Sequence, residues 1–164
     1  MNSPVSHTSI HVRPYRQRDT ASLAHLFTET VHAINANDYS PEQLAAWAPQ
    51  PPDIGRWHER LSGLIVFVAE ENDSEIVGFS TLNPSGYLDH LYIHKNFQRR
   101  GIATALYQRL EQEALSRALP RIFTEGSETA RSFFENAGFR MIAPQTIEHR
   151  GISFTNYCME KFLS

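Results

Sequence analysis

Apolar residues along the 164-residue chain recur with two spacings, one typical of strands and one typical of helices. Runs rich in branched and aromatic residues predict strands over residues 9–13, 64–70, 75–82, 86–94 and 121–125. The polar residues 71–74 separate the second run from the third and have a turn composition, so these two strands should form an antiparallel hairpin. A last hairpin is expected around Gly151.

Helices are predicted where apolar residues are three and four positions apart. Asp19 can cap a first helix, whose buried stripe comprises Leu23, Leu26, Phe27, Val31 and Ile34. The Ser-Pro-Glu-Gln run from Ser40 has the form of a capping box and predicts a second helix over residues 41–47. Later helices should begin at Ile102 and at Ser127. The order is a helix pair, a strand meander and a strand-helix-strand-helix-strand tail, which predicts a mixed α/β (α+β) fold.

Length and composition limit the classes of protein to which this chain can belong. With 41% hydrophobic residues in 164, we expect a single domain over residues 1–164. A net charge of −3 gives no broad positive field for nucleic acid, and the longest apolar run, residues 64–69, is too short to span a bilayer. Cys158 is the single cysteine, and residues 1–10 lack the pattern of a secretory signal. We therefore expect a cytoplasmic protein with no nucleic-acid or membrane partner.

The stretch NFQRRGIATAL, residues 96–106, joins a predicted strand to a predicted helix. The first N–H groups of a helix lack backbone acceptors and carry a partial positive charge. Gly101 allows close backbone approach, Ala103 keeps the helix start free of bulk, and the two arginines add charge. The stretch is therefore a candidate phosphate cradle, although taken alone it is equally consistent with a solvated loop.

Two blocks of the sequence resemble one family. Residues 88–111, LDHLYIHKNFQRRGIATALYQRLE, resemble the acyl-CoA-binding motif of the GNAT superfamily of N-acetyltransferases, a strand followed by Gln/Arg-x-x-Gly-x-Gly/Ala. Residues 127–139, SETARSFFENAGF, are similar to a later GNAT block, with Ala130, Gly138 and Phe139 in register. The likeness extends over nearly the whole chain, and is greatest to small bacterial acetyltransferases with a Tyr-Ser-Pro-Glu-Gln-x-x-Ala-Trp-Ala segment.

This resemblance implies the cofactor and the way it is held. The family fold has a central mixed, mostly antiparallel sheet that is splayed at the cofactor site and flanked by helices. Acetyl-CoA would lie in the splay, with its pantetheine arm on strand main chain and its diphosphate on the helix start. By resemblance the cofactor-binding residues are Leu91, Tyr92, Ile93, Gln98, Arg99, Arg100, Gly101, Ile102, Ala103, Thr104, Ser127 and Phe134.

The sequence departs from the family pattern at two positions. Ser127 stands where the second block has asparagine, and Phe134 stands where many relatives have the tyrosine that protonates the leaving thiolate. A phenyl ring cannot donate a proton. Tyr157, on the last predicted strand, is the candidate replacement; the alternative is that it is a packed strand tyrosine. Cys158 is expected to be a small core residue rather than a nucleophile.

A general base is needed because the attacking amine must be neutral. Strand alternation predicts a shared face for Tyr87, Asp89, Leu91 and Ile93. Relatives commonly place a carboxylate on this strand, so Asp89 is a candidate base or ammonium anchor, unless it only pairs with an arginine. His90 should lie on the opposite face as a rival base or a core histidine. Glu125, at the end of the next strand, is either a base acting through water or a solvated strand end.

The acceptor pocket is assigned to one N-terminal segment and one strand residue. The candidate substrate-binding residues are His32, Asn35, Tyr39, Trp47 and Tyr87. Tyr39 and Trp47 have an alternative role as packing between two helices. His25 and His32 are about 10 Å apart along a helix axis, too far to chelate one ion, so no metal is expected.

Three functions remain open from the sequence. The leading one is an N-acetyltransferase that transfers an acetyl group directly from acetyl-CoA to a primary amine of a small molecule or xenobiotic. The second is a noncatalytic acyl-CoA-binding module, which the Phe134 substitution keeps open. The third is acetylation of a protein lysine or N-terminus. A homodimer is compatible with the resemblance.

Overall fold

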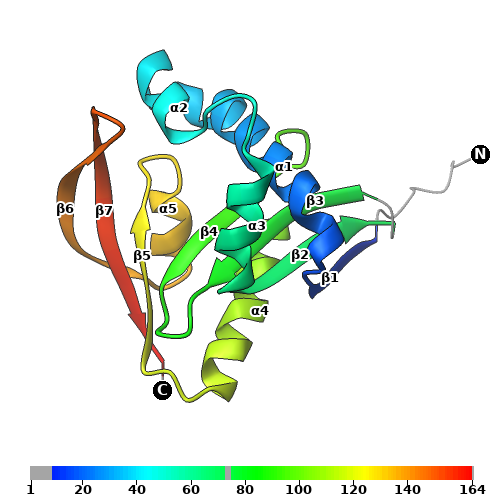
Figure 1. Cartoon of the computed structure of the whole chain (residues 1–164). Helices are drawn as coiled ribbons and strands as arrows, with labels where there is room; N and C mark the ends of the chain where they lie inside the picture. The colour runs from blue at the N-terminus through cyan, green and yellow to red at the C-terminus, as the bar shows by residue number, and fades with distance from the viewer. Residues whose placement is uncertain (1–8, 73–74, 164) are drawn as a thin grey trace, which may run out of the picture.

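In the computed structural model, which describes residues 9–72 and 75–163, seven strands form two antiparallel sheets (Figure 1). The first sheet has the order β1-β2-β3-β4 and comprises β1 (Ile10–Pro14), β2 (Ile65–Glu71), β3 (Glu75–Leu82) and β4 (Leu88–Ile93). The second has the order β5-β7-β6 and comprises β5 (Arg121–Gly126), β6 (Arg140–His149) and β7 (Ile152–Phe162). The predicted meander and final hairpin are thereby confirmed.

Five α-helices and two short 3-10 turns accompany the described strands. The α-helices are α1 (Thr20–Ile34), α2 (Pro41–Trp47), α3 (Ile54–Ser62), α4 (Ile102–Ser116) and α5 (Arg131–Asn136). The 3-10 turns are η1 (Gln17–Asp19) and η2 (Asn35–Asn37). Residues 1–8, considered above for a signal, and the turn residues Asp73 and Ser74 lie outside the described residues.

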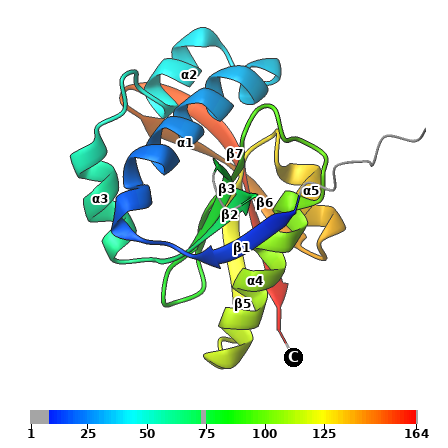
Figure 2. The ribbon, with the colours of Figure 1, turned by 90° about the vertical axis from the view of Figure 1, so that its right-hand side faces the viewer.

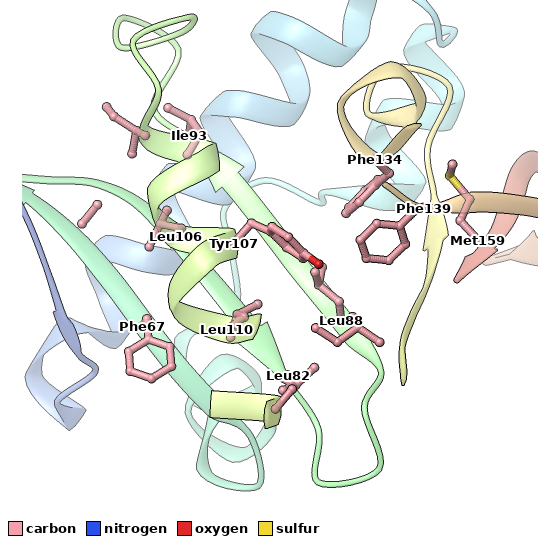
Figure 3. Packing of buried hydrophobic residues seen from close by; sticks show 14 of the residues in the cluster. Phe67, Leu82, Leu88, Ile93, Leu106, Tyr107, Leu110, Phe134, Phe139 and Met159 are labelled. Carbon is pink, nitrogen blue, oxygen red and sulfur yellow. The ribbon is translucent and has the colours of Figure 1, made fainter. Parts of the chain in front are cut away.

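Helices cover both faces of the first sheet (Figure 2). On one face α1 and α3 enclose a core that includes Val68 and Phe79, both fully buried. On the other face α4 packs Leu106 and Leu110 against the sheet, and this core continues under α5 and β7 (Figure 3). Gly78 faces α4 so closely that a Cβ there would lie 3.0 Å from Leu106 Cδ1.

The starts of the N-terminal helices follow their sequence signals with one exception. The capping box of α2 is present: Ser40 Oγ accepts from Gln43 N at 3.2 Å, and Gln43 Oε1 accepts from Ser40 N at 2.9 Å. Asp19 stands at the N-cap of α1, but its carboxylate accepts hydrogen bonds from Arg13 at 2.8 and 3.0 Å and does not cap the helix. The prediction that Asp19 caps this helix is wrong because a buried arginine takes its oxygens.

The predicted helix pair is in fact three helices, because α3 follows the proline cluster. Asp53 caps α3, with Oδ1 accepting from Arg56 N at 3.1 Å. Leu61 is buried and Trp57 packs edge-on against Phe27 of α1, with ring centroids 4.9 Å apart. Helix α3 therefore packs against α1 and lies next to β4.

Candidate active site

Strands β4 and β5 run side by side and then separate. They meet at a single parallel bridge between Tyr87 and Phe123, where Phe123 N donates to Gly86 O at 3.0 Å. Gly86 has φ +105°, and a Cβ there would lie 2.5 Å from Arg121 O, so only glycine fits this junction. Beyond it the two sheets part, and a cleft of about 1050 Å³ lies between them.

At one end the cleft meets the start of α4, which is the stretch that the sequence predicts as a phosphate cradle. Arg99 and Gly101 have φ of +60° and +79°, and no side chain caps the helix. The first helical hydrogen bond runs from Ala105 N to Gly101 O at 3.1 Å, so the N–H groups of residues 102–104 have no acceptor within the helix. All three residues line the cleft together with Arg99 and Gly101. The donor groups, the helix dipole and the arginine fit an anionic diphosphate. We call this the donor end.

The loop before α4 is fastened to the strand end by Gln98. Its Nε2 donates to Ile93 O at 2.7 Å and to His94 O at 3.3 Å, and Thr30 Oγ1 also donates to Ile93 O, at 3.0 Å. Because His94 N donates to Val77 O of β3, alternation directs the main chain of Leu91 and Ile93 away from β3, into the gap. The Leu91 amide and carbonyl are thus directed into the gap between the strands.

All but one of the predicted cofactor-binding residues line this cleft. Ser127 and Phe134 do so from the β5–α5 side; Ser127 Oγ accepts from Ala130 N at 3.1 Å, which makes a turn ahead of the short α5. Phe134 is 3% exposed and packs against Phe139. Arg100 does not line the cleft, because its guanidinium lies over the Phe97 ring, 4.9 Å from the centroid.

The other end of the cleft, the acceptor end, is enclosed by side chains from α1, α2, α3 and the β6–β7 hairpin. Aromatic rings form much of its wall: Phe27, Tyr39, Trp47, Trp57, Tyr92 and Phe154. Gln43 Nε2 of α2 donates to Ser153 O, next to the turn of the hairpin, at 3.0 Å, which joins two of these elements. Arg56, Arg60 and Asp53 also line it, all from α3 or its cap.

A β-bulge sets the direction of Asp89. Leu82 pairs with Leu88 while Thr81 pairs with His90, so Asp89 is an extra residue in β4. The expected common face of Tyr87, Asp89, Leu91 and Ile93 is therefore wrong: Leu91 packs with the α4 core, whereas Asp89 is turned toward α3.

On that side Asp89 meets a partner that the sequence analysis did not identify. Arg60 donates to it from Nη2 at 2.7 and 2.9 Å and from Nε at 3.2 Å. The carboxylate is 17% exposed and the guanidinium-bearing side chain 58% exposed. Asp89 is therefore a paired carboxylate, which is the arginine alternative raised from the sequence.

His90 lies beside Asp89 instead of opposite it, with Nδ1 3.8 Å from Asp89 Oδ2. It is 5% exposed, hydrogen bonded through Nδ1 to Thr81 Oγ1 at 2.8 Å, and 5.2 Å from the Trp57 ring centroid. Burial lowers the pKa of His90 to about 4, with Asp89 opposing this shift and Arg60 adding to it. At neutral pH the imidazole is uncharged and a weak base.

Glu125 is the second carboxylate of the acceptor end. It is exposed, it lines the cleft, and no ion pair to it occurs among residues 9–72 and 75–163. Glu125 is two residues beyond Phe123 on β5, and Asp89 is two residues beyond Tyr87 on β4, so both carboxylates follow the bridge that joins the two strands. Burial raises the pKa of Tyr87, and the charges of Glu125 and Asp89 raise it further.

Two predicted side chains lie outside the cleft lining. The Tyr157 hydroxyl donates a short hydrogen bond to Glu128, which raises its pKa, and its ring lies under the Arg131 guanidinium at 4.6 Å. His32 donates from Nε2 to Ala48 O at 2.7 Å and supports the loop after α2. Asn35, Tyr39, Trp47 and Tyr87 do line the cleft.

Sequence reasoning missed Arg60 and Trp57 because it missed α3. The signal was present, since Asp53 precedes apolar residues at positions 54, 57 and 61 with helical spacing. Within the described part of the chain no group of three or more His, Cys, Asp or Glu side chains is placed to hold a metal. No described helix is long and apolar enough to cross a membrane.

Comparison with known proteins agrees with this geometry. Residues 35–161 match the family model described as "Acetyltransferase (GNAT) domain". The chain is 34% identical over 151 residues to YafP, an uncharacterized N-acetyltransferase of Escherichia coli K12, covering 92% of this chain and 95% of YafP. It also resembles a GCN5-related N-acetyltransferase of Rhodopseudomonas palustris, with TM-score 0.89, 31% identity, and coverage of 95% of this chain and 98% of that one.

A more distant structure shares the fold. The PaiA N-acetyltransferase of Thermoplasma acidophilum, solved in complex with coenzyme A, has a TM-score of 0.76 and 18% identity over 94% of this chain and 99% of that one. The family match covers well over half of the described chain, and the cleft between separated strands has the form expected from the sequence. This chain belongs to the GNAT family of acetyltransferases.

Proposed function

We propose that this protein transfers the acetyl group of acetyl-CoA directly to a primary amine of a small molecule. The observation that carries the proposal is the uncapped start of α4, which opens into the same cleft as the unpaired main chain of Leu91. Family membership supports acetyltransferase activity. Family membership and the geometry of the donor end together support acetyl-CoA as the source of the acetyl group.

The donor end would bind the coenzyme through main-chain N–H groups and an arginine that already line the cleft. The amides of residues 102–104 and Arg99 would bind the diphosphate, and Leu91 main chain would pair with the pantetheine arm. When bound, the thioester supplies an activated acetyl carbonyl. Main-chain N–H groups beside the gap are suited to stabilise negative charge on its oxygen.

Glu125 is the proposed base. It lines the cleft and has no ion-pair partner in the described ranges, whereas Asp89 is held by Arg60. Arg60 donates to both oxygens of Asp89, so this carboxylate has fewer acceptor positions left for an amine N–H. Glu125 would take the proton of the amine directly or through one water, and Asp89 would position Arg60 and the acceptor.

No tyrosine need protonate the departing thiolate. Phe134 cannot donate, and the Tyr157 hydroxyl already donates to Glu128 outside the cleft lining. Thiols have an ordinary pKa of about 8.5, so a thiolate leaves readily near neutral pH and takes its proton from water. The noncatalytic alternative, raised by Phe134, loses its main argument for this reason.

The enclosed acceptor end favours a small acceptor over a protein lysine or N-terminus. Its wall is formed by α2, α3 and the β6–β7 hairpin, and the Gln43–Ser153 hydrogen bond joins two of them. A peptide acceptor requires an open groove along which main chain can lie.

Two measurements test the proposal. Thiol release from acetyl-CoA is measured across free amines and peptides, and coenzyme A binding is measured by calorimetry with Thr104→Glu. Thr104 is exposed in the first turn of α4, so a glutamate there suits the helix but repels a diphosphate. We expect coenzyme A affinity to fall about 10- to 100-fold, or about 1.4 to 2.8 kcal/mol, with no loss of thermal stability.

Gln108→Glu is the matched control, because it adds the same charge on the exposed face of α4 outside the cleft lining. If the two variants bind coenzyme A with equal affinity, the start of α4 is not part of the coenzyme site. Absence of thiol release with every amine and peptide would defeat the acetyltransferase proposal itself.

A further inference from the structure

Arg60 at the acceptor end has binding capacity that its ion pair does not use. It engages Asp89 through Nε and Nη2, and no hydrogen bond to Nη1 occurs among the described residues. Its side chain is 58% exposed and lines the cleft. A guanidinium has five donors in a planar fork, so one N–H edge of Arg60 stays available for a planar anion.

The helix α3 fixes where that edge lies. Arg60 is in the last turn of α3, next to the buried Leu61 and one turn after Trp57, which packs against Phe27. Asp89 holds the other edge from the neighbouring strand, at the bulge of β4. The guanidinium is thus oriented from two elements, which a surface ion pair of two mobile side chains does not achieve.

Of the carboxylates that line the acceptor end, one has no ion-pair partner among the described residues and can bind an amine. Asp53 pairs with Arg56 at 3.7 Å, and Asp89 pairs with Arg60, while Glu125 has no ion-pair partner among the described residues. Glu125 lines the same cleft from β5, two residues after Phe123, which bridges to Tyr87. Arg60 lines it from α3 and is held at Asp89, two residues after Tyr87. The site therefore offers an ammonium anchor and a carboxylate anchor within one cleft.

Aromatic rings enclose the space beside these anchors. Trp57, Phe27 and Tyr92 line the cleft, with Phe27 centroids 4.9 Å from Trp57 and 4.8 Å from Tyr92. Such rings bury an apolar or aromatic group and satisfy no charge on it. The acceptor end thus combines two opposite charges with an apolar wall.

We propose that the acceptor is an α-amino acid with a large apolar or aromatic side chain, whose carboxylate binds the free N–H edge of Arg60. This inference rests on the proposed function. The amino nitrogen forms a bond to the acetyl carbon as the carbon–sulfur bond breaks. The amine proton goes to Glu125 and then to water, and the thiolate takes a proton, which gives an N-acetylamino acid and free coenzyme A.

The test compares two amines that differ only in their carboxyl group, L-phenylalanine and L-phenylalaninamide, in which a neutral amide replaces the carboxylate. For the wild-type protein we expect kcat/KM to favour L-phenylalanine at equal free-amine concentration by about tenfold or more. Arg60→Gln should remove that preference by lowering kcat/KM for L-phenylalanine and leaving the amide within about threefold. Arg117→Gln is the matched control, because Arg117 pairs with Glu113 at 3.0 Å outside the cleft lining.

A double variant separates Arg60 from its effect on Asp89. Arg60→Gln with Asp89→Asn leaves no unpaired buried carboxylate, and it should still show no preference between the two amines. Asp89→Asn alone keeps the guanidinium and should keep the preference, even with a lower rate. Binding of L-phenylalanine in the presence of coenzyme A, followed by tryptophan fluorescence because Trp47 and Trp57 line the cleft, should weaken about tenfold in Arg60→Gln.

Three results would overturn the inference. One is a wild-type protein that acetylates the amide as well as the acid; another is an Arg60→Gln variant that loses both activities equally. In either case thiol release with these amines leaves the acetyltransferase proposal standing. The third, no thiol release with any amine, overturns the proposed function and this inference together.

Discussion

The two ends of the cleft are built in different ways. The donor end consists of main-chain groups from one continuous stretch, residues 98–104, fastened by Gln98 to the end of β4. The acceptor end consists of side chains from α1, α2, α3, β4, β5 and the β6–β7 hairpin. A site made of neighbouring backbone is specified locally, whereas a site made of distant side chains depends on the whole fold. Substitutions at the two ends should therefore separate coenzyme binding from amine chemistry.

The largest expected effect is at the acceptor end. Glu125→Gln should lower kcat about 100-fold or more, because the proposed base is removed, while coenzyme A affinity stays within about twofold. Steady-state thiol release and calorimetry measure the two quantities. Asp89→Asn is the companion variant and should lose less than about tenfold, since Arg60 already occupies that carboxylate. A larger loss in Asp89→Asn than in Glu125→Gln would exchange the roles assigned to the two carboxylates.

The acceptor wall should also respond to acid through His90. Its folded-state pKa of about 4 is below the ordinary value of 6.5, so between these pH values the unfolded chain binds more protons at this residue. The contribution of the neutral imidazole is complete above pH 6.5 and declines as pH falls to 4, by about 3 kcal/mol in all.

Denaturant unfolding at pH 7 and at pH 4.5 measures this decline. His90→Gln should show a smaller loss of unfolding free energy over that interval than the wild-type protein. Asp89 and Arg60, whose charges act on His90, remain in both proteins. Equal pH dependence of the two proteins would contradict the assignment of a buried neutral imidazole.

The smallest expected effect is at the donor end. Gln98→Ala removes the hydrogen bonds to Ile93 O and His94 O, which should cost about 1 kcal/mol of stability and weaken coenzyme A binding about three- to tenfold. The ratio of kcat/KM between any two amines should not change. Gln108→Ala, on the exposed face of α4, is the control. A changed amine preference in Gln98→Ala would show that the two ends are not separable.

The sequence predicted the donor end because its signals are local. The Gly101 turn, the helix start and the strand before it fall within a dozen residues, and the capping box at Ser40 is equally local. The acceptor end depended on two features that the sequence analysis missed. One was α3, obscured by the proline cluster before it, and the other was the bulge that turns Asp89 toward Arg60. Burial of His90 and the Tyr157–Glu128 contact depend on tertiary packing.

The bulge in β4 has an evolutionary consequence. Deleting the codon for Asp89 would restore regular pairing of Leu88, His90 and Leu91 with β3 and would remove one carboxylate from beside Arg60. The helix start that follows this strand would keep its sequence and its position relative to Ile93. Insertion or deletion of one codon can thus add or remove a charge next to the acceptor during evolution. The proposed coenzyme site would be unchanged.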